Sequence, residues 1–269
     1  MTIDPVQSLK KYGWLHFYQM DKVDKNEFIF PILSKGEGIY VYDTYGKRYI
    51  DALSGAYCVN VGYGRKSILN AAFKAAEQIH FVTPFSAANI PMIQLANKLS
   101  ELAKPVTGDR SRVYFVNSGS EAVDTAIKIA RAYARRTIKP NGYKVICRNN
   151  SYHGTTFGAM SCSGFDGMKE EFAPLVPGIY HAPNSNCRRC ALGLSFPTCG
   201  IACAKEISNI INREGVDSIA AVLIEPVETS NGSDSPPQGY LNKVSEICKI
   251  NNTLLIIDEV ITGFGRLSH

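Results

Sequence analysis

The chain has 269 residues and 45% of them are apolar, which is enough to bury a sizeable core. Its net charge of +5 comes from basic residues that are scattered or paired, so we do not expect nucleic-acid binding. No apolar stretch is long enough to span a membrane, and the N-terminus lacks a signal-peptide pattern, so we expect a cytoplasmic protein with reduced cysteines.

The N-terminal part of the chain predicts an arm and a hairpin. Residues 1 to about 35 mix aromatic and polar side chains, and residues 38–51 form two β-rich runs around an Asp-Thr-Tyr-Gly turn. We assign residues 1–60 to this arm and hairpin, and residues 61–269 to one large domain.

From residue 66 onward, helical and β-rich patterns alternate. We expect helices near 66–79, 91–103, 120–136, 204–213 and 240–250, and strands at 112–116, 144–148, 179–181, 220–225 and 254–257. This alternation predicts an α/β fold with a mostly parallel sheet covered by helices.

Two of the predicted strands are apolar runs that end in an acid. Residues 254–257 lead into Asp258, and residues 221–224 lead into Glu225. Such runs are typical of strands buried on both faces, and open α/β sheets bind ligands at the carboxyl ends of their strands. Because buried acids need partners, we expect one of these carboxylates to pair with a protonated nitrogen of a ligand.

Two turns that follow predicted strands have residues suited to ligand binding. Gly119 and Ser120 begin a helix, where free backbone N–H groups bind phosphate well, although Ser118-x-x-Glu121 also fits a plain capping box. Tyr152 lies beside a glycine in a polar turn, where it could stack on a planar ligand or be an ordinary surface tyrosine.

Two other enzyme classes lack their motifs. The acid after residues 254–257 also resembles the metal-binding acid of nucleotide hydrolases, but the sequence has no G-x-x-x-x-G-K-[ST] loop. It has no G-x-S-x-G motif either, which argues against a serine hydrolase of the α/β type.

A cysteine-rich insert has the spacing C-x2-C-x8-C-x3-C. Its members are Cys187, Cys190, Cys199 and Cys203. Four thiolates could hold a structural zinc ion or an iron–sulfur cluster, and buried reduced thiols are the alternative.

Taken together, the chain resembles the class III aminotransferases that use pyridoxal 5′-phosphate (PLP), in particular the ω-amino acid and amine:pyruvate branch. The motifs that carry this resemblance lie at residues 42–51, 60–64, 117–122, 152–154, 225–226 and 258–266. The resemblance implies a PLP-dependent transferase fold of type I. It also implies a homodimer in full-length relatives and the transfer of an amino group from an ω-amino acid or amine to pyruvate or another oxo acid.

The resemblance also implies roles for individual residues. Gly119 and Ser120 would hold the cofactor phosphate, Tyr152 and Val260 would contact the two faces of the ring, and Asp258 would pair with the pyridine nitrogen. Glu225 would orient this assembly. Tyr57 would form a wall of the amine pocket, although a core tyrosine fits that position as well.

One family feature is missing from the 269 residues. In relatives, a lysine that follows the acid forms the Schiff base with PLP, and here the sequence ends at His269 without it. We therefore expect a fold that is truncated at the C-terminus, without the C-terminal small domain, and a polypeptide that is inactive alone. The alternative is a non-catalytic PLP-binding pseudo-enzyme, or a partner subunit of a full-length homologue.

Overall fold

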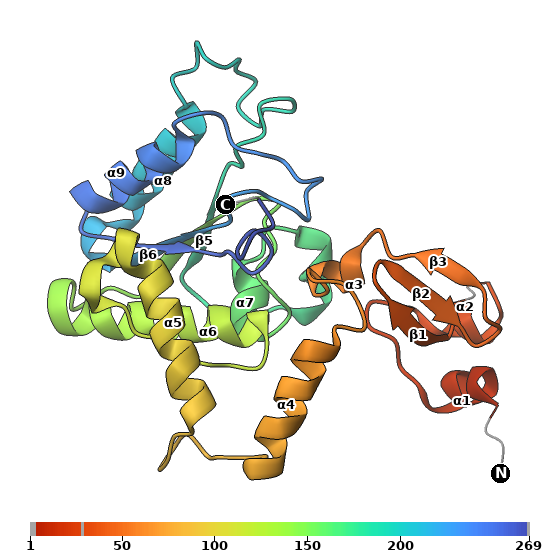
Figure 1. Ribbon diagram of the computed structural model, residues 1–269. Coiled ribbons are helices and arrows are strands. Elements are labelled where there is room, and N and C mark those ends of the chain that lie inside the picture. The colour runs from red at the N-terminus through yellow and green to blue at the C-terminus, as the bar shows by residue number, and fades with distance from the viewer. Residues whose placement is uncertain (1–3, 28–29, 268–269) are drawn as a thin grey trace. The chain divides into compact units, whose positions relative to one another are not determined.

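The computed structural model describes residues 4–27 and 30–267, and the chain divides into two compact units (Figure 1). Unit 1 is Met1–Arg112 and unit 2 is Val113–His269. This division falls later than the domain boundary we drew at residue 60, because helices α4 (Lys66–Gln78) and α5 (Ile90–Thr107) group with the N-terminal segment. The domain assignment for the family fold remains a prediction.

Unit 1 contains an antiparallel sheet in the order β1-β2-β3. The predicted hairpin is confirmed as β2 (Tyr40–Asp43) and β3 (Arg48–Ile50), while β1 (Leu33–Glu37) was not predicted. Asp43 closes the hairpin turn. Its Oδ1 accepts hydrogen bonds from the backbone N–H groups of Tyr45 and Lys47, each at 2.9 Å, and its Oδ2 accepts one from the Tyr49 hydroxyl at 2.8 Å.

The remaining helices of unit 1 are short, apart from the predicted α4 and α5. They are α1 (Pro5–Tyr12), α2 (Met20–Asp24), α3 (Ser54–Tyr57) and the 3-10 turn η1 (Gly108–Arg110). α3 is a left-handed turn, because φ is positive at all four of its residues, from 54° at Ser54 to 68° at Tyr57. Left-handed backbone costs about 1–2 kcal/mol per non-glycine residue. Asp51 holds the turn, since its Oδ2 accepts from Gly55 N at 2.8 Å and from the Tyr63 hydroxyl at 2.7 Å.

Unit 2 is built on the predicted parallel sheet, with strand order β5-β4-β6-β7. The strands are β4 (Lys144–Arg148), β5 (Ile179–Ala182), β6 (Ile219–Ile224) and β7 (Leu254–Ile257). The inner strand β6 is buried along its whole length, at all six of its residues. β6 and β7 are neighbours in register, with Ile224 opposite Ile257, so the residues that follow these two strands emerge side by side.

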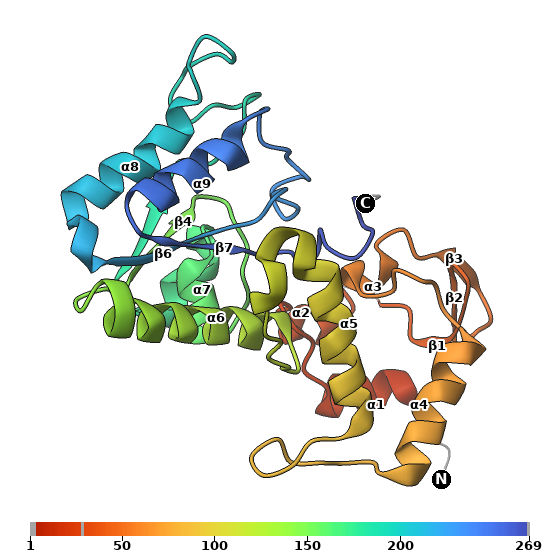
Figure 2. The same cartoon turned by 60° about the vertical axis from the view of Figure 1, so that its left-hand side comes forward.

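Helices cover both faces of this sheet (Figure 2). Buried side chains of α6 (Gly119–Tyr133) and α7 (Phe157–Cys162) pack on one face, and those of α8 (Ala202–Glu214) and α9 (Tyr240–Ile250) pack on the other. Short turns complete the unit: η2 (Ala134–Ile138), η3 (Asp166–Met168), η4 (Glu170–Phe172) and η5 (Val216–Ser218). The prediction of an α/β fold is confirmed. No helix within the described residues has both the length and the apolar character needed to cross a bilayer.

One predicted strand is wrong. Residues 112–116 form no strand, and Tyr114 and Phe115 are 72% and 40% exposed. A strand requires a neighbouring backbone, and the sheet of the described residues offers none to this segment. The β-rich composition of this segment therefore does not produce a strand.

Glu214, at the end of α8, connects that helix to two strands. Its carboxylate pairs with Lys144 on β4 at 3.0 Å and with Arg213 at 3.1 Å. Hydrogen bonds from Tyr180 on β5, from Lys144 and from Arg213 lower the pKa of Glu214 to about 2. The folded state therefore favours the ionised form.

We predict that Glu214→Gln removes a pH-dependent part of the stability. A carboxyl with a lowered pKa stabilises the folded state above its ordinary pKa of 4.5, and that contribution is lost as the pH falls toward 2. Urea unfolding at pH 7 and at pH 3 should show a larger pH effect in the native chain than in this variant. Glu206→Gln, a change at a half-buried residue of the same helix that forms no ion pair among the described residues, is the control and should show the same pH effect as the native chain.

Candidate active site

A cavity of about 190 Å³ opens at the carboxyl end of the unit 2 sheet. It is bounded by the start of α6, the turn after β4, and the segments that follow β6 and β7. The structure brings together here every cofactor-site residue expected in this unit. The lining residues are Gly119, Ser120, Tyr152, His153, Gly154, Glu225, Asp258, Val260, Ile261 and Thr262.

The first turn of α6 forms one wall of the cavity. Ser118 caps the helix, since its Oγ accepts from Glu121 N at 3.2 Å, and Glu121 Oε2 accepts from Asn117 N at 2.8 Å. The capping interpretation is therefore correct, and it leaves the N–H groups of Gly119 and Ser120 in the first helical turn, where a helix favours an anion. A Cβ on Gly119 would come 3.2 Å from Val260 Cγ1, so glycine keeps this wall open.

Gly154 allows the turn after β4 to approach α6 closely. Its φ of 133° disfavours other residues, and a Cβ there would meet Ser120 Oγ and lie 2.9 Å from Ala159 Cβ. The approach lets Thr155 N donate to Ser120 Oγ at 3.0 Å. That bond orients the serine hydroxyl beside the helix N-terminus.

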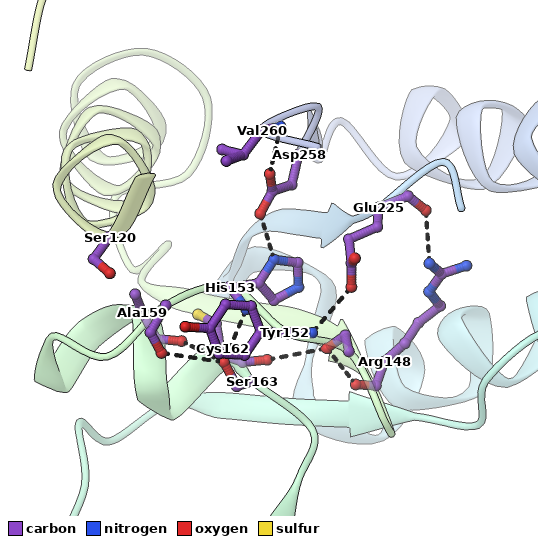
Figure 3. A network of polar contacts seen from close by, with 12 residues as sticks. Ser120, Arg148, Tyr152, His153, Ala159, Cys162, Ser163, Glu225, Asp258 and Val260 are labelled. Atoms are coloured by element: carbon purple, nitrogen blue, oxygen red, sulfur yellow. Dashed lines mark hydrogen bonds and ion pairs between the residues drawn. The ribbon is translucent and has the colours of Figure 1, made fainter. Parts of the chain in front are cut away.

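Asp258 is held at the tip of β7 by three hydrogen bonds. Its backbone N–H donates to Ile224 O at 2.8 Å, which extends the strand pairing by one residue. Its Oδ1 accepts from Val260 N at 3.1 Å, and its Oδ2 lies 2.8 Å from His153 Nδ1 (Figure 3). Because the carboxylate accepts, the hydrogen on the imidazole is assigned to Nδ1. The Asp258 side chain is only 7% exposed, so its position is well fixed.

Glu225 lies at the neighbouring strand end, as the sequence predicted. Its Oε1 accepts from Tyr152 N at 3.0 Å, which fixes the turn that carries the tyrosine. Burial raises the pKa of Glu225 and the nearby Asp258 adds to this effect, while the Tyr152 N–H and His153 oppose it. The cavity therefore holds two acids in different electrostatic surroundings.

A buried ion pair lies behind Glu225. The Arg148 Nε and Glu228 Oε1 atoms are 2.9 Å apart, with side chains 0% and 1% exposed. Arg148 also donates from Nη2 to Glu225 O at 2.6 Å and from Nη1 to Ser185 Oγ at 3.2 Å (Figure 3 shows the contact with Glu225). This arginine ties the end of β4 to the loops that follow β5 and β6.

Sequence reasoning missed three residues of this assembly: His153, Arg148 and Glu228. Arg148 ends the apolar strand β4 much as the two acids follow β6 and β7, so the same pattern of an apolar run and a charge was available as a signal. His153 lies within the motif at 152–154, but its role was not predicted, and Glu228 offered no comparable signal, because their partners are 105 and 80 residues away.

Two other predicted sites have different outcomes. Tyr57 lies in unit 1 on α3, and its role in the amine pocket stays a prediction. The four cysteines of the insert line one small cavity, but no three metal-binding side chains among the described residues gather closely enough to hold an ion. Burial raises the pKa of the Cys203 thiol, and apolar Leu192 and Phe196 share the cavity. The predicted zinc or iron–sulfur site is therefore not supported.

The fold agrees with comparisons to known proteins. A family model described as aminotransferase class-III matches residues 21–267, and the chain belongs to this family. A probable aminotransferase of Mycobacterium tuberculosis is 40% identical over 254 residues, which cover 94% of this chain and 53% of the relative. The taurine–pyruvate aminotransferase of Bilophila wadsworthia is 37% identical over 273 residues, 99% of this chain and 57% of the relative. The chain thus spans about half the length of the curated relatives it matches.

Solved structures give the same result. A thermostable (S)-enantioselective ω-transaminase from Thermomicrobium roseum matches with a TM-score of 0.90 and 35% identity, covering 97% of this chain and 57% of that chain. An amine transaminase from an uncultivated Pseudomonas species, solved with PLP bound, matches with a TM-score of 0.88 and 28% identity, over 94% and 56% of the two chains. The predicted family and the predicted PLP-dependent transferase fold are confirmed.

We predict that the Arg148–Glu228 pair acts as a unit. Glu228→Met alone leaves a buried guanidinium without its carboxylate, which should lower the free energy of unfolding by about 3–5 kcal/mol. The double variant Arg148→Met, Glu228→Met should be clearly more stable than the sum of the two single losses implies, as measured by urea unfolding. Glu246→Met breaks an exposed pair with Lys243 and should cost no more than about 1 kcal/mol. Strict additivity of the two buried changes would contradict the prediction.

Proposed function

We propose that unit 2 binds PLP in the cavity at the carboxyl end of its sheet. The observation that carries the proposal is the placement of Asp258, a fixed and nearly buried carboxylate, in the same cavity as the N–H groups that begin α6. A ligand with an anionic group at one end and a protonated ring nitrogen at the other satisfies both features at once. PLP is such a ligand, and PLP-dependent relatives share this fold.

The donor set of the cavity fits this cofactor. Gly119 and Ser120 supply backbone N–H groups and a hydroxyl for the phosphate, and the half-buried Tyr152 offers a ring for stacking. Val260, 62% exposed, supplies an apolar contact for the other ring face. Thr262 Oγ1 is buried without a hydrogen-bond partner in the described structure, so one further polar group is left for a ligand.

The residues around Asp258 fix its carboxylate in a position where it can accept a hydrogen bond from a protonated ring nitrogen. His153 donates from Nδ1 to Oδ2, so Asp258 cannot rotate away, and Val260 N holds the other oxygen. When bound, PLP supplies an electron sink that stabilises the carbanion formed as an amine substrate loses its proton, and a protonated ring strengthens that sink. Glu225 contributes by fixing the backbone of Tyr152.

From its family, we propose that the complete protein transfers an amino group from an ω-amino acid or amine to pyruvate or another oxo acid. Relatives include a taurine–pyruvate aminotransferase from Bilophila wadsworthia and a putrescine–pyruvate aminotransferase from Pseudomonas aeruginosa. We place Tyr57 in the wall that contacts the amine. We also propose that the complete protein works as a homodimer, which the apolar side chains exposed on α4 and α5 support, among them Ile68, Phe73 and Ile93.

Gly154→Ala tests the cofactor site. The new methyl group would displace Ser120 Oγ, so PLP affinity, followed by the absorbance of the bound cofactor, should fall at least about tenfold, equivalent to about 1.4 kcal/mol. Gly167→Ala is the matched control, because nothing lies within 4 Å of a Cβ at that position. Equal PLP affinity in the two variants would contradict the placement of the phosphate.

A second test concerns turnover. The residues that line the cavity include no lysine among those described, so we propose that the 269-residue polypeptide by itself binds PLP without transaminating. Purified protein with PLP, an amine and pyruvate should form no alanine above a protein-free control. Steady alanine production would overturn this part of the proposal. The competing function, a non-catalytic subunit of a longer homologue, would instead show increased alanine formation when the two proteins are mixed.

A further inference from the structure

A second polar cavity lies near the same edge of the unit 2 sheet and shares no lining residue with the cavity assigned to PLP. It encloses about 430 Å³. Its walls come from the loops after β4, β5 and β6, and they contain only amide and guanidinium side chains and a glycine. The lining residues are Asn150, Asn184, Asn186, Arg188, Arg189, Asn231 and Gly232.

Two amides of this cavity, those of Asn184 and Asn186, have their side-chain oxygens occupied. Asn186 Oδ1 accepts from the backbone N–H groups of Arg188 and Arg189, each at 2.8 Å. Asn184, 7% exposed, accepts from Asn186 N through its own Oδ1 at 3.4 Å. Because backbone N–H groups donate to the Oδ1 atoms of Asn184 and Asn186, the Nδ2 groups of these two side chains remain to bind a ligand.

The charge of the cavity is positive. Arg188 Nη2 pairs with Asp234 Oδ1 at 3.1 Å, so that guanidinium is partly neutralised. Arg189 has no ion pair in the part of the chain that the structure describes, and no acid lines the cavity. One guanidinium without an ion pair and two amides whose oxygens are engaged therefore belong to residues that line a cavity without a counter-charge, a composition that suits an oxyanion.

The walls are held in place from behind. Asn231 Nδ2 donates to Glu228 Oε2 at 3.3 Å, and Glu228 is paired with the buried Arg148. Glu228 and Asp234 also exchange backbone hydrogen bonds at 3.0 and 3.1 Å. The loop that carries Asn231 and Gly232 therefore has a fixed conformation, which lowers the entropy cost of binding at this wall.

We propose that this cavity binds a phosphate group, either as free phosphate or carried by a small metabolite. Phosphate offers three or four acceptor oxygens to the guanidinium and amide donors, whereas a carboxylate offers two. The proposal does not depend on PLP binding at Asp258, because the two cavities use different residues.

Calorimetric titration of the PLP-saturated protein at low ionic strength tests the proposal. Inorganic phosphate should bind saturably at one site, and Arg189→Gln should weaken that binding at least tenfold. Arg136→Gln, an exposed change outside the cavity, is the matched control and should leave binding unchanged. Glycerol phosphate and glycerol form parallel arms: tighter binding of the ester indicates a metabolite, tighter binding of phosphate indicates the free ion, and glycerol should not bind.

Several results would overturn the proposal: no saturable phosphate binding, or equal binding by Arg189→Gln and the native chain, or equal loss in Arg136→Gln. Arg189 is exposed, so its variant should keep the native unfolding transition, which is measured alongside. If PLP itself fails to bind, phosphate can also enter the cradle at α6. Binding there would respond to Gly154→Ala and not to Arg189→Gln, so the two failures are distinguishable.

Discussion

The site depends on one electrostatic constraint: a nearly buried carboxylate, Asp258, held at the end of a parallel strand by a histidine. Burying such a group is costly unless hydrogen bonds and an opposite charge compensate it. His153 and the Val260 N–H provide the hydrogen bonds, and they also prevent the carboxylate from turning toward solvent. The Asp258 carboxylate still requires an opposite charge, which explains why a protonated ring nitrogen suits this position. Glu225, one strand away, is held differently, through Tyr152 N, and burial raises its pKa.

The parallel register of the sheet places other polar groups beside this carboxylate. β6 and β7 end side by side, which places Glu225 and Asp258 on the same edge. The start of α6 and the turn after β4 line the same cavity as these two acids, as expected for a ligand site at the carboxyl ends of parallel strands. Arg148 then joins the loops of β5 and β6 beneath the cavity. The arrangement follows the general behaviour of open α/β sheets, with the chemistry supplied by loops and the rigidity by strands.

Much of the parallel sheet and of the candidate site could be predicted from local sequence. The apolar runs that end in Asp258 and Glu225 gave both the strands and the edge at which they end, and small residues at a helix start indicated an anion cradle. Local patterns failed where structure depends on partners far along the chain. Residues 112–116 have strand composition without a neighbour to pair with in the described sheet, and β1 was missed because its polar sequence lacks the alternation of a half-buried strand.

The cysteine insert shows a different limit. Its spacing resembles that of a metal site, but spacing along the chain does not determine where sulfur atoms meet in space, and apolar side chains share their cavity. His153 illustrates the reverse case, since a residue of ordinary appearance becomes central through a partner 105 positions away. Both outcomes depend on tertiary packing, which motifs record only in part.

The central claim is that Asp258 faces the protonated nitrogen of bound PLP. Nitrogen-15 NMR of ring-labelled PLP, bound to the native chain and to Asp258→Asn, tests it most directly. We expect a protonated ring nitrogen in the native chain and in Glu259→Gln, an exposed neighbouring acid, and an unprotonated nitrogen in Asp258→Asn. An identical nitrogen signal in the native chain and in Asp258→Asn would contradict the account.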